Sequence, residues 1–173
     1  KNSNREFWEK ILEYKKNSPS KVMWEIAADA TYPENKEWVK EIAVQMNILS
    51  INLTEAKALL GVEELEDVIE QLRSWGVELV FLRRGDKGSI MITPDDTVIV
   101  PAEKNVKIVD PTGGGNSSSG AVLCGFCEGQ TLEKCARMGN LSAVMCLSQY
   151  GVPEEISEEM QKEARRKLEE ETC

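Results

Sequence analysis

Apolar and polar positions alternate along the chain with two different periods, and the period changes several times. Residues 5–16 ("REFWEKILEYKK") place apolar side chains at helical spacing opposite charged ones, which predicts an amphipathic surface helix. Residues 21–27 ("KVMWEIA") predict a strand. Within residues 29–46, Trp38, Ile42 and Met46 then recur at every fourth position, as on a helix. Together these runs predict a β-loop-α unit.

The same alternation continues through residue 83. A short buried strand is predicted at residues 47–52 ("NILSIN"), and helices closed by glycine are predicted at 53–61 and 64–76. The run "VELVFLR" at 77–83 predicts another strand. Strands that alternate with helices favour an α/β fold, with a largely parallel sheet flanked by helices.

The pattern changes after residue 88. Three short strands separated by turn residues are predicted at 89–93, 97–101 and 106–110, which is typical of an antiparallel meander. From Gly115 onward the chain is predicted to be helical, ending in an acidic helix over residues 153–173. We find no repeat or linker, so residues 1–173 are expected to form a single α/β domain.

Composition and charge narrow the function classes. No apolar run approaches the roughly 20 residues that span a bilayer, and the N-terminus lacks the apolar centre of a signal peptide, so we expect no membrane partner and a cytoplasmic location. A net charge of -9 without a basic stripe disfavours nucleic acid. Five cysteines, an odd number in a long chain, favour reduced thiols over a disulfide framework.

Two other segments have simple structural interpretations. The "CGFC" run at Cys124 and Cys127 has the spacing of a metal or redox motif, but zinc usually takes four ligands and the chain has no His. We therefore predict thiols buried as small apolar side chains. The acidic terminal helix is predicted to be a solvated face with intrahelical ion pairs.

The stretch "DPTGGGNSSSGA", residues 110–121, places three glycines between a strand-like and a helix-like run. The first turn of a helix carries unpaired N–H groups and a partial positive charge, and glycine lets the backbone approach an anion closely. The alternative is a tight turn with Asn116 or Ser117 as an ordinary N-cap. Neither GxxxxGK[ST] nor GxGxxG fits, because no Lys follows the glycines and Ser118 occupies the third glycine position.

This stretch resembles the signature of the ribokinase-like (pfkB-type) carbohydrate kinases, whose usual form is Asp-Thr-Thr-Gly-Ala-Gly-Asp before a helix of small residues. The positions that match are Asp110, Thr112, Gly113, Gly115 and Gly120. The likeness runs in collinear order over about residues 20–152.

Three other elements carry the resemblance. The segment "ILSINLTEAKALLG" is similar to the family's Asn-x-x-Glu element, through Asn52 and Glu55. The segment "VFLRRGDKGS" is similar to its Thr-x-Gly-x-x-Gly turn, with Gly85 and Gly88 in place and Arg83 instead of Thr. The late helix of the family, which flanks the adenine, corresponds here to the segment around Asn140.

The resemblance implies ATP-dependent transfer of a phosphoryl group to a hydroxyl of a sugar or sugar-like substrate. It implies that Gly113, Gly114 and Gly115 form an anion hole, and that Glu55 holds Mg²⁺ through water beside Asn52. The remaining matches imply a nucleotide site, with positions at Arg83, Gly85, Gly88, Asp110, Thr112 and Asn140. Structural alternatives stay open: "NLTE" is itself a capping box, "RGDKG" a hairpin turn, and Asn140 a polar helix residue.

Asn116 departs from the family pattern. The family has Asp at this position as the proposed base, and an amide is no useful proton acceptor at neutral pH. One interpretation is a divergent or weakened kinase, because phosphoryl transfer depends mostly on positioning and charge stabilisation. The second is a catalytically inactive, nucleotide-binding scaffold or regulator. The third is an engineered Asp-to-Asn trap, against which the atypical "SSS" speaks.

The N-terminal half of the family's fold is not recognisable in the sequence. We therefore expect the C-terminal, nucleotide-binding part of such a kinase, with one exposed sheet edge. A sugar-like acceptor would bind through the missing half, and this chain unaided is expected not to phosphorylate it. A second copy of the chain is a further candidate partner.

Overall fold

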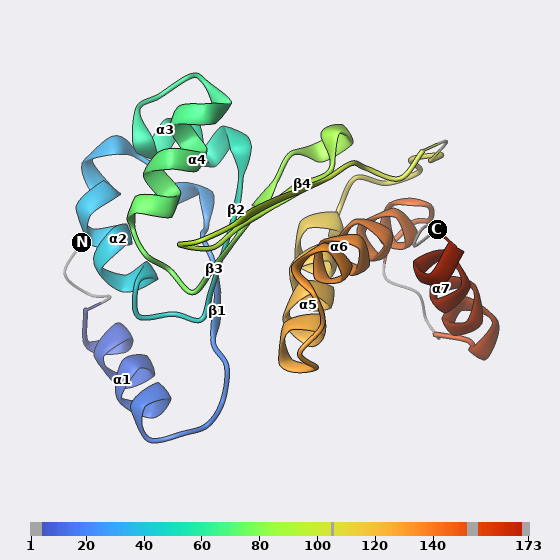
Figure 1. Ribbon diagram of the computed structural model, residues 1–173, viewed down its shortest axis with the longest axis horizontal. Helices are drawn as coiled ribbons and strands as arrows, with labels where there is room; N and C mark the ends of the chain where they lie inside the picture. The colour runs from blue at the N-terminus through green and yellow to red at the C-terminus, as the bar shows by residue number, and fades with distance from the viewer. Residues whose placement is uncertain (1–4, 105, 152–155, 171–173) are drawn as a thin grey trace. The chain divides into compact units, whose positions relative to one another are not determined.

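The computed structural model describes residues 5–104, 106–151 and 156–170. The chain divides into two compact units. One comprises the chain up to Leu82 together with Ile92–Thr97, and the other comprises Arg83–Met91 together with the chain from Val98 onward. Figure 1 shows the elements of both.

Five strands form one sheet in the order β1-β2-β3-β4-β5. Their bounds are β1 Met23–Glu25, β2 Ile48–Asn52, β3 Leu79–Arg83, β4 Ser89–Ile92 and β5 Thr97–Val100. β1 pairs with β2 in parallel, with Trp24 opposite Leu49. Short turns join β3 to β4 and β4 to β5, so the sheet is mixed with a mostly parallel core. The predicted α/β class is confirmed.

The helices of the first unit follow the predicted pattern. They are α1 Arg5–Lys16, α2 Lys36–Ala43, α3 Leu53–Leu60 and α4 Leu65–Ser74, with short 3₁₀ turns η2 Ala28–Ala30 and η3 Pro33–Asn35. α2 contains Trp38 and Ile42 but ends at Ala43, before Met46, which was expected on the same helix. Pro33 has no N–H for an interior helical bond and instead begins the η3 turn, so the α-helix starts only at Lys36.

The core of the first unit is built on β2 and β3. The first four residues of each strand are buried, as expected of strands that are covered on both faces. Leu59 of α3 and Leu72 of α4 are fully buried with them. Burial of the apolar side chains of these strands and helices stabilises this unit.

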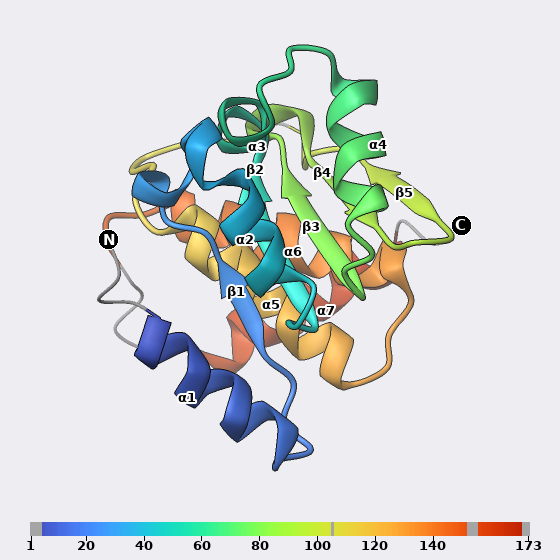
Figure 2. The ribbon, with the colours of Figure 1, turned by 90° about the vertical axis from the view of Figure 1, so that its left-hand side faces the viewer.

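An aromatic cluster fixes the N-terminal helix to the same unit. Trp8 of α1 lies 4.7 Å, centroid to centroid, from Trp24 of β1, and Trp24 lies 5.9 Å from Trp38 of α2. Figure 2 shows α1 running alongside β1. The three half-buried rings pack in tilted and edge-on geometries, which aromatic pairs favour.

The second unit is mostly helical. It contains η4 Gly85–Lys87, α5 Gly114–Cys127, α6 Leu132–Leu147 and α7 Glu158–Glu170. α5 and α6 lie side by side (Figures 1 and 2). The predicted start of the last helix at residue 153 lies outside the described residues. None of the helices that the structure describes combines the length and apolar character needed to cross a membrane.

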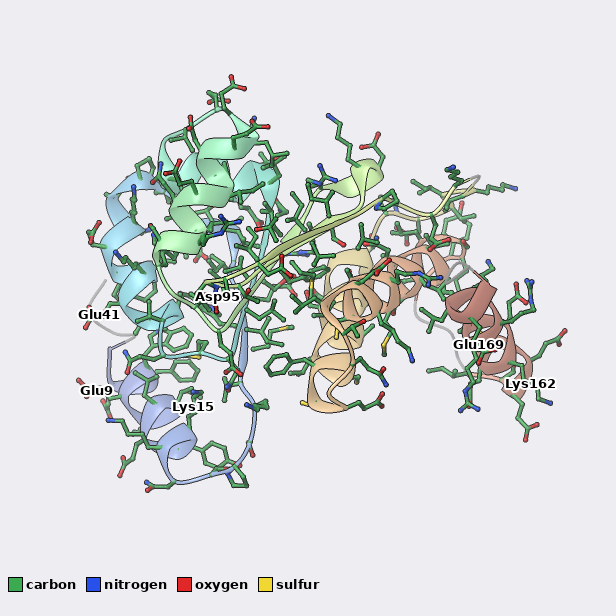
Figure 3. The ribbon with its side chains drawn as sticks, viewed as in Figure 1. Glu9, Lys15, Glu41, Asp95, Lys162 and Glu169 are labelled. Atoms are coloured by element: carbon green, nitrogen blue, oxygen red, sulfur yellow. The ribbon has the colours of Figure 1, made fainter. Side chains whose placement is uncertain are left out.

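The terminal helix shows the predicted intrahelical ion pairs. Lys162 pairs with Glu158 at 3.7 Å, and Arg166 pairs with Glu163 at 2.6 Å. Lys162 projects outward from α7 (Figure 3). The opposite face packs inward, and the guanidinium of Arg137 on α6 donates to the Lys167 carbonyl at 2.9 Å. A cation at the C-terminal turn of α7 also complements the helix dipole.

Two sequence predictions are wrong. Residues 106–110, all described, form no strand; the Val109 and Asp110 amides instead donate to the carbonyl of Leu147, at the end of α6. Cys124 and Cys127 are exposed rather than buried. α5 buries a single face, which includes Val122 and Gly125, and the two cysteines lie on the other side of the helix. In the described chain no three metal-binding side chains gather into a cluster.

Asn47 holds together the starts of the parallel strands. Its Oδ1 accepts from the Val22 amide at 2.9 Å, and its Nδ2 donates to Glu78 Oε2 at 2.6 Å. The side chain is only 6% exposed. We expect Asn47→Ala to lower the free energy of unfolding by about 1–3 kcal/mol, because a part-buried amide loses its acceptor.

Urea unfolding measures this change, and Asn17→Ala is the matched control. Asn17 is exposed and donates only to Glu13 within its own helical end, so its loss should stay within about 0.5 kcal/mol. Equal effects of the two substitutions would contradict the assigned role of Asn47.

Candidate functional site

The N-terminus of α5 presents backbone amides without a side-chain cap. The N-cap is Gly113, in the left-handed conformation at φ 84°, and glycine has no side chain that could accept from the first turn. The first helical bond runs from the Ser117 amide to the Gly113 carbonyl at 2.9 Å. The amides of residues 114–116 therefore have no partner within the helix, and the dipole makes this end attractive to an anion.

The sequence alternative, in which Asn116 or Ser117 caps this helix, is wrong. Asn116 is the third residue of α5, and its side chain is exposed. Ser117 Oγ lies 2.6 Å from Ser142 Oγ of α6, and Ser142 Oγ donates back to the Ser117 carbonyl at 3.2 Å. Ser118 and Ser119 are buried. The serine run thus lets α5 and α6 approach closely, which explains residues that looked atypical in the sequence.

Packing against the end of α6 explains two of the three glycines. A Cβ on Gly114 would lie 2.7 Å from Cδ2 of Leu147, and a Cβ on Gly113 would lie 3.3 Å from Sγ of Cys146. Gly113 also needs its positive φ. We call the open N-terminal turn of α5, residues 113–116, the mouth of α5. The glycines let the C-terminal end of α6 pack directly against it.

The chain enters this mouth through a turn held by Asp110. The Thr112 amide donates to Asp110 Oδ1 at 2.9 Å, and Cys146 Sγ donates to the Thr112 carbonyl at 3.5 Å. The hydrogen bond from the Thr112 amide lowers the pKa of Asp110 below its ordinary value of 3.8.

The stabilisation from this lowered pKa is complete above the unfolded-chain value and is lost as pH falls through the folded value. Asp110 is therefore ionised at neutral pH. A carboxylate can only accept hydrogen bonds, so its contribution to an anion site lies in shaping the turn.

The turn between β3 and β4 contains the second group of predicted residues. Gly85 has φ 60° and Gly88 has φ 84°, and the Arg84 amide donates to the Gly88 carbonyl at 2.8 Å. A Cβ on Gly88 would overlap the backbone of Val100 and Ala102. The "RGDKG" segment is therefore a tight turn seated on the chain that follows β5, and Arg83 enters it half-buried.

Asn140 lies in the buried part of α6 and uses both ends of its amide within the protein. Its Oδ1 accepts from Ser89 Oγ at 2.9 Å, and its Nδ2 donates to the Pro101 carbonyl at 2.9 Å. Asn140 and Leu147 are two helical turns apart, about 10 Å along the axis of α6. The same helix thus supports the Gly88 turn at one point and the glycine turn at another.

Asn52 and Glu55 belong to the other unit and form a complete capping box. Asn52 Oδ1 accepts from the Glu55 amide at 2.8 Å, and Glu55 Oε2 accepts from the Asn52 amide at 3.0 Å. The structural alternative for "NLTE" is thus confirmed as geometry. It leaves Glu55 Oε1 available among the described residues, and carboxylate oxygen is a donor that Mg²⁺ accepts directly or through water.

The structure therefore gathers most of the predicted site residues in one unit. The second unit holds Arg83, Gly85, Gly88, Asp110, Thr112, Gly113, Gly114, Gly115, Asn116 and Asn140. The first holds Asn52 and Glu55. Ser89 and Pro101, which the sequence did not single out, complete the surroundings of Asn140; a buried serine after a glycine turn gives no distinctive sequence signal.

Comparison with known proteins decides the family. The model of the pfkB family carbohydrate kinases matches residues 1–159. The chain belongs to this family. It is 34% identical over 122 residues to a cytidine kinase of Thermococcus kodakarensis, an alignment that covers 69% of this chain and 44% of the relative. The chain thus spans less than half the length of that kinase.

Solved structures of two kinases share the fold of this chain. An adenosine kinase from Sinorhizobium meliloti superposes with a TM-score of 0.81 and 22% identity, over 93% of this chain and 49% of that one. A fructokinase from Vibrio cholerae O395, solved with fructose, ADP and calcium ion, gives a TM-score of 0.73 and 19% identity, over 87% and 52%. The ribokinase-like fold predicted from the sequence is confirmed.

The packing of the glycine turn predicts different effects on stability for two glycines of α5. Gly120 is exposed with open space around its Cα, so Gly120→Ala should stabilise the chain by about 0.5–1 kcal/mol through helix propensity. A methyl group in Gly114→Ala must displace Leu147. The free energy of unfolding of this variant should therefore be about 1–3 kcal/mol lower than that of Gly120→Ala.

Urea unfolding of both variants, followed by far-UV circular dichroism, gives the comparison. Equal stabilisation by the two substitutions would show that Leu147 does not restrict the mouth of α5.

Proposed function

We propose that this chain provides the nucleotide-binding part of a kinase that transfers the terminal phosphoryl group of ATP to a hydroxyl of a sugar or sugar-like substrate. The observation that carries the proposal is the glycine N-terminus of α5, which has no side-chain cap, in a chain of the pfkB family. The related cytidine kinase, adenosine kinase and fructokinase have in common acceptors that contain a sugar. The acceptor class proposed here is accordingly a nucleoside or free sugar.

The amides at residues 113–115 would stabilise charge on the phosphoryl group during transfer. These donors are fixed in place by α6 before any ligand arrives, through the contacts of Leu147 and Cys146. Preorganised donors of this kind account for much of the catalysis of phosphoryl transfer. Asp110 and Thr112 hold the approach to the helix in the required turn.

Mg²⁺, when bound with ATP, would supply positive charge against the phosphate oxygens. Glu55 is the residue of this chain that would hold it, through water, while Asn52 keeps the carboxylate oriented by the capping box. The turn at Gly85–Gly88 and the α6 segment at Asn140 would lie at the base and ribose end, with Arg83 at the entry of that turn.

Asn116 decides between two functions. Its exposed amide, on the first turn of α5, cannot accept the proton of a sugar hydroxyl as a carboxylate would. Transfer would then proceed at a reduced rate, because a loose transition state depends more on positioning than on a base. The second candidate, favoured by the same residue, is a nucleotide-binding scaffold without turnover.

We expect Asn116→Asp to raise the stability of the chain and to lower its affinity for nucleotide. A carboxylate in the first turn should stabilise α5 by about 0.3–1 kcal/mol through the helix dipole. The same charge beside polyphosphate should weaken binding of Mg-ATP by roughly fivefold, since two like charges about 4 Å apart in water repel by about 1 kcal/mol. Calorimetric titration with Mg-ATP and urea unfolding measure the two effects.

Gln130→Glu is the matched control, because it adds one negative charge just beyond the other end of α5. The 14-residue helix is about 21 Å long, beyond the Debye length of about 8 Å, so the control should leave Mg-ATP affinity unchanged. Wild-type chain that binds no nucleotide would refute the proposal. This chain unaided is expected to lack the acceptor site, so hydrolysis of bound Mg-ATP by water is the readout. Hydrolysis that rises in Asn116→Asp supports the kinase, and nucleotide binding without hydrolysis in both proteins supports the scaffold.

A further inference from the structure

A buried polar network joins three segments of the second unit. Ser89 of β4 is 1% exposed and Asn140 of α6 is 9% exposed, and a 2.9 Å hydrogen bond connects their side chains. The other end of the Asn140 amide donates to the carbonyl of Pro101, just after β5, also at 2.9 Å. The network thus links β4, the end of β5 and α6.

The chemistry of the partners fixes the orientation of Asn140. The Pro101 carbonyl can only accept, so the Asn140 NH₂ group must face it. The Asn140 oxygen then faces Ser89, whose hydroxyl donates to it. Buried polar groups with satisfied partners hold a single geometry, because breaking either bond leaves a group without its hydrogen bond away from water.

The residue before Ser89 ties the network to the β3–β4 turn. Gly88 packs its Cα directly against the backbone of Val100, Pro101 and Ala102. Ser89 and Gly88 are consecutive, and Pro101 takes part in both contacts. Any displacement of Asn140 is therefore passed through Pro101 and Ser89 to the turn at Gly85–Gly88.

We propose that Ser89 is a positioning residue, which shapes the base end of the nucleotide site through its hydrogen bond to Asn140 and through the Gly85–Gly88 turn. This inference rests on the proposed nucleotide site. We expect Ser89 to contribute as much to ATP affinity as Asn140 does, although Ser89 is buried.

The test compares two ligands that share the phosphate chain. Mg-ATP would use both the α5 mouth and the base end, whereas Mg-tripolyphosphate would use the α5 mouth alone. We expect Ser89→Ala and Asn140→Ala each to weaken Mg-ATP binding by roughly 5- to 10-fold. Binding of Mg-tripolyphosphate should stay at the wild-type level. The double variant should lose no more than either single one, because both substitutions break one network.

Thr131→Ala is the control for loss of stability alone. Thr131 caps the other end of α6 by accepting from the Lys134 amide, so its loss should lower the urea midpoint without changing either affinity. Where Ser89→Ala reduces the yield of folded chain, Ser89→Cys keeps a weak donor of similar size and should bind Mg-ATP with intermediate affinity.

The outcomes distinguish failure of the positioning role from failure of the nucleotide site. Wild-type Mg-ATP affinity in Ser89→Ala, together with a large loss in Asn140→Ala, would show a direct base contact and overturn the positioning role. Equal losses for both ligands would show general disruption and overturn it too. Wild-type chain that binds neither ligand would refute the nucleotide site itself.

Discussion

The contact between the C-terminal end of α6 and the first turn of α5 determines how the candidate site of the second unit is arranged. Leu147 occupies the space that a side chain on Gly114 would need, and the carbonyl of the same leucine accepts from the Val109 and Asp110 amides. One residue thus positions both the helix mouth and the segment that leads into it. The unpaired carbonyls that end a helix normally face water or a cap, and here they organise the approach to another helix.

This arrangement gives the glycines a double purpose. A Gly-rich helix start is costly in chain entropy, and the proposed binding of an anion would offset that cost only when the ligand is present. The steric fit of Gly113 and Gly114 against Cys146 and Leu147 is present without a ligand. The mouth is therefore preorganised, which is what electrostatic stabilisation of a transferring phosphoryl group requires.

The sequence predicted the parts of the fold whose signals are local. The apolar runs of β2 and β3, the capping box at Asn52 and the glycine turns at Gly85 and Gly113 all carry short-range patterns, and the structure has each of them. Residues 106–110 have the composition of a strand, but their amides bond to α6, a partner that a local pattern cannot reveal.

The roles of single side chains were harder to predict, because they depend on which face of a helix is covered. Cys124 and Cys127 lie on the uncovered face of α5, although their neighbours are apolar. For Asn140 the sequence left open a nucleotide contact and an ordinary polar helix residue, and in the structure it is the centre of a buried network.

The aromatic cluster of the first unit has a practical consequence for spectroscopy. All four tryptophans of the chain, Trp8, Trp24, Trp38 and Trp75, belong to that unit. All five cysteines come after residue 123, and the four that the structure describes lie in the other unit. Indole emission therefore reports on one half of the molecule and thiol labelling on the other. The chain therefore carries a native probe for each unit, and no substitution is needed to introduce one.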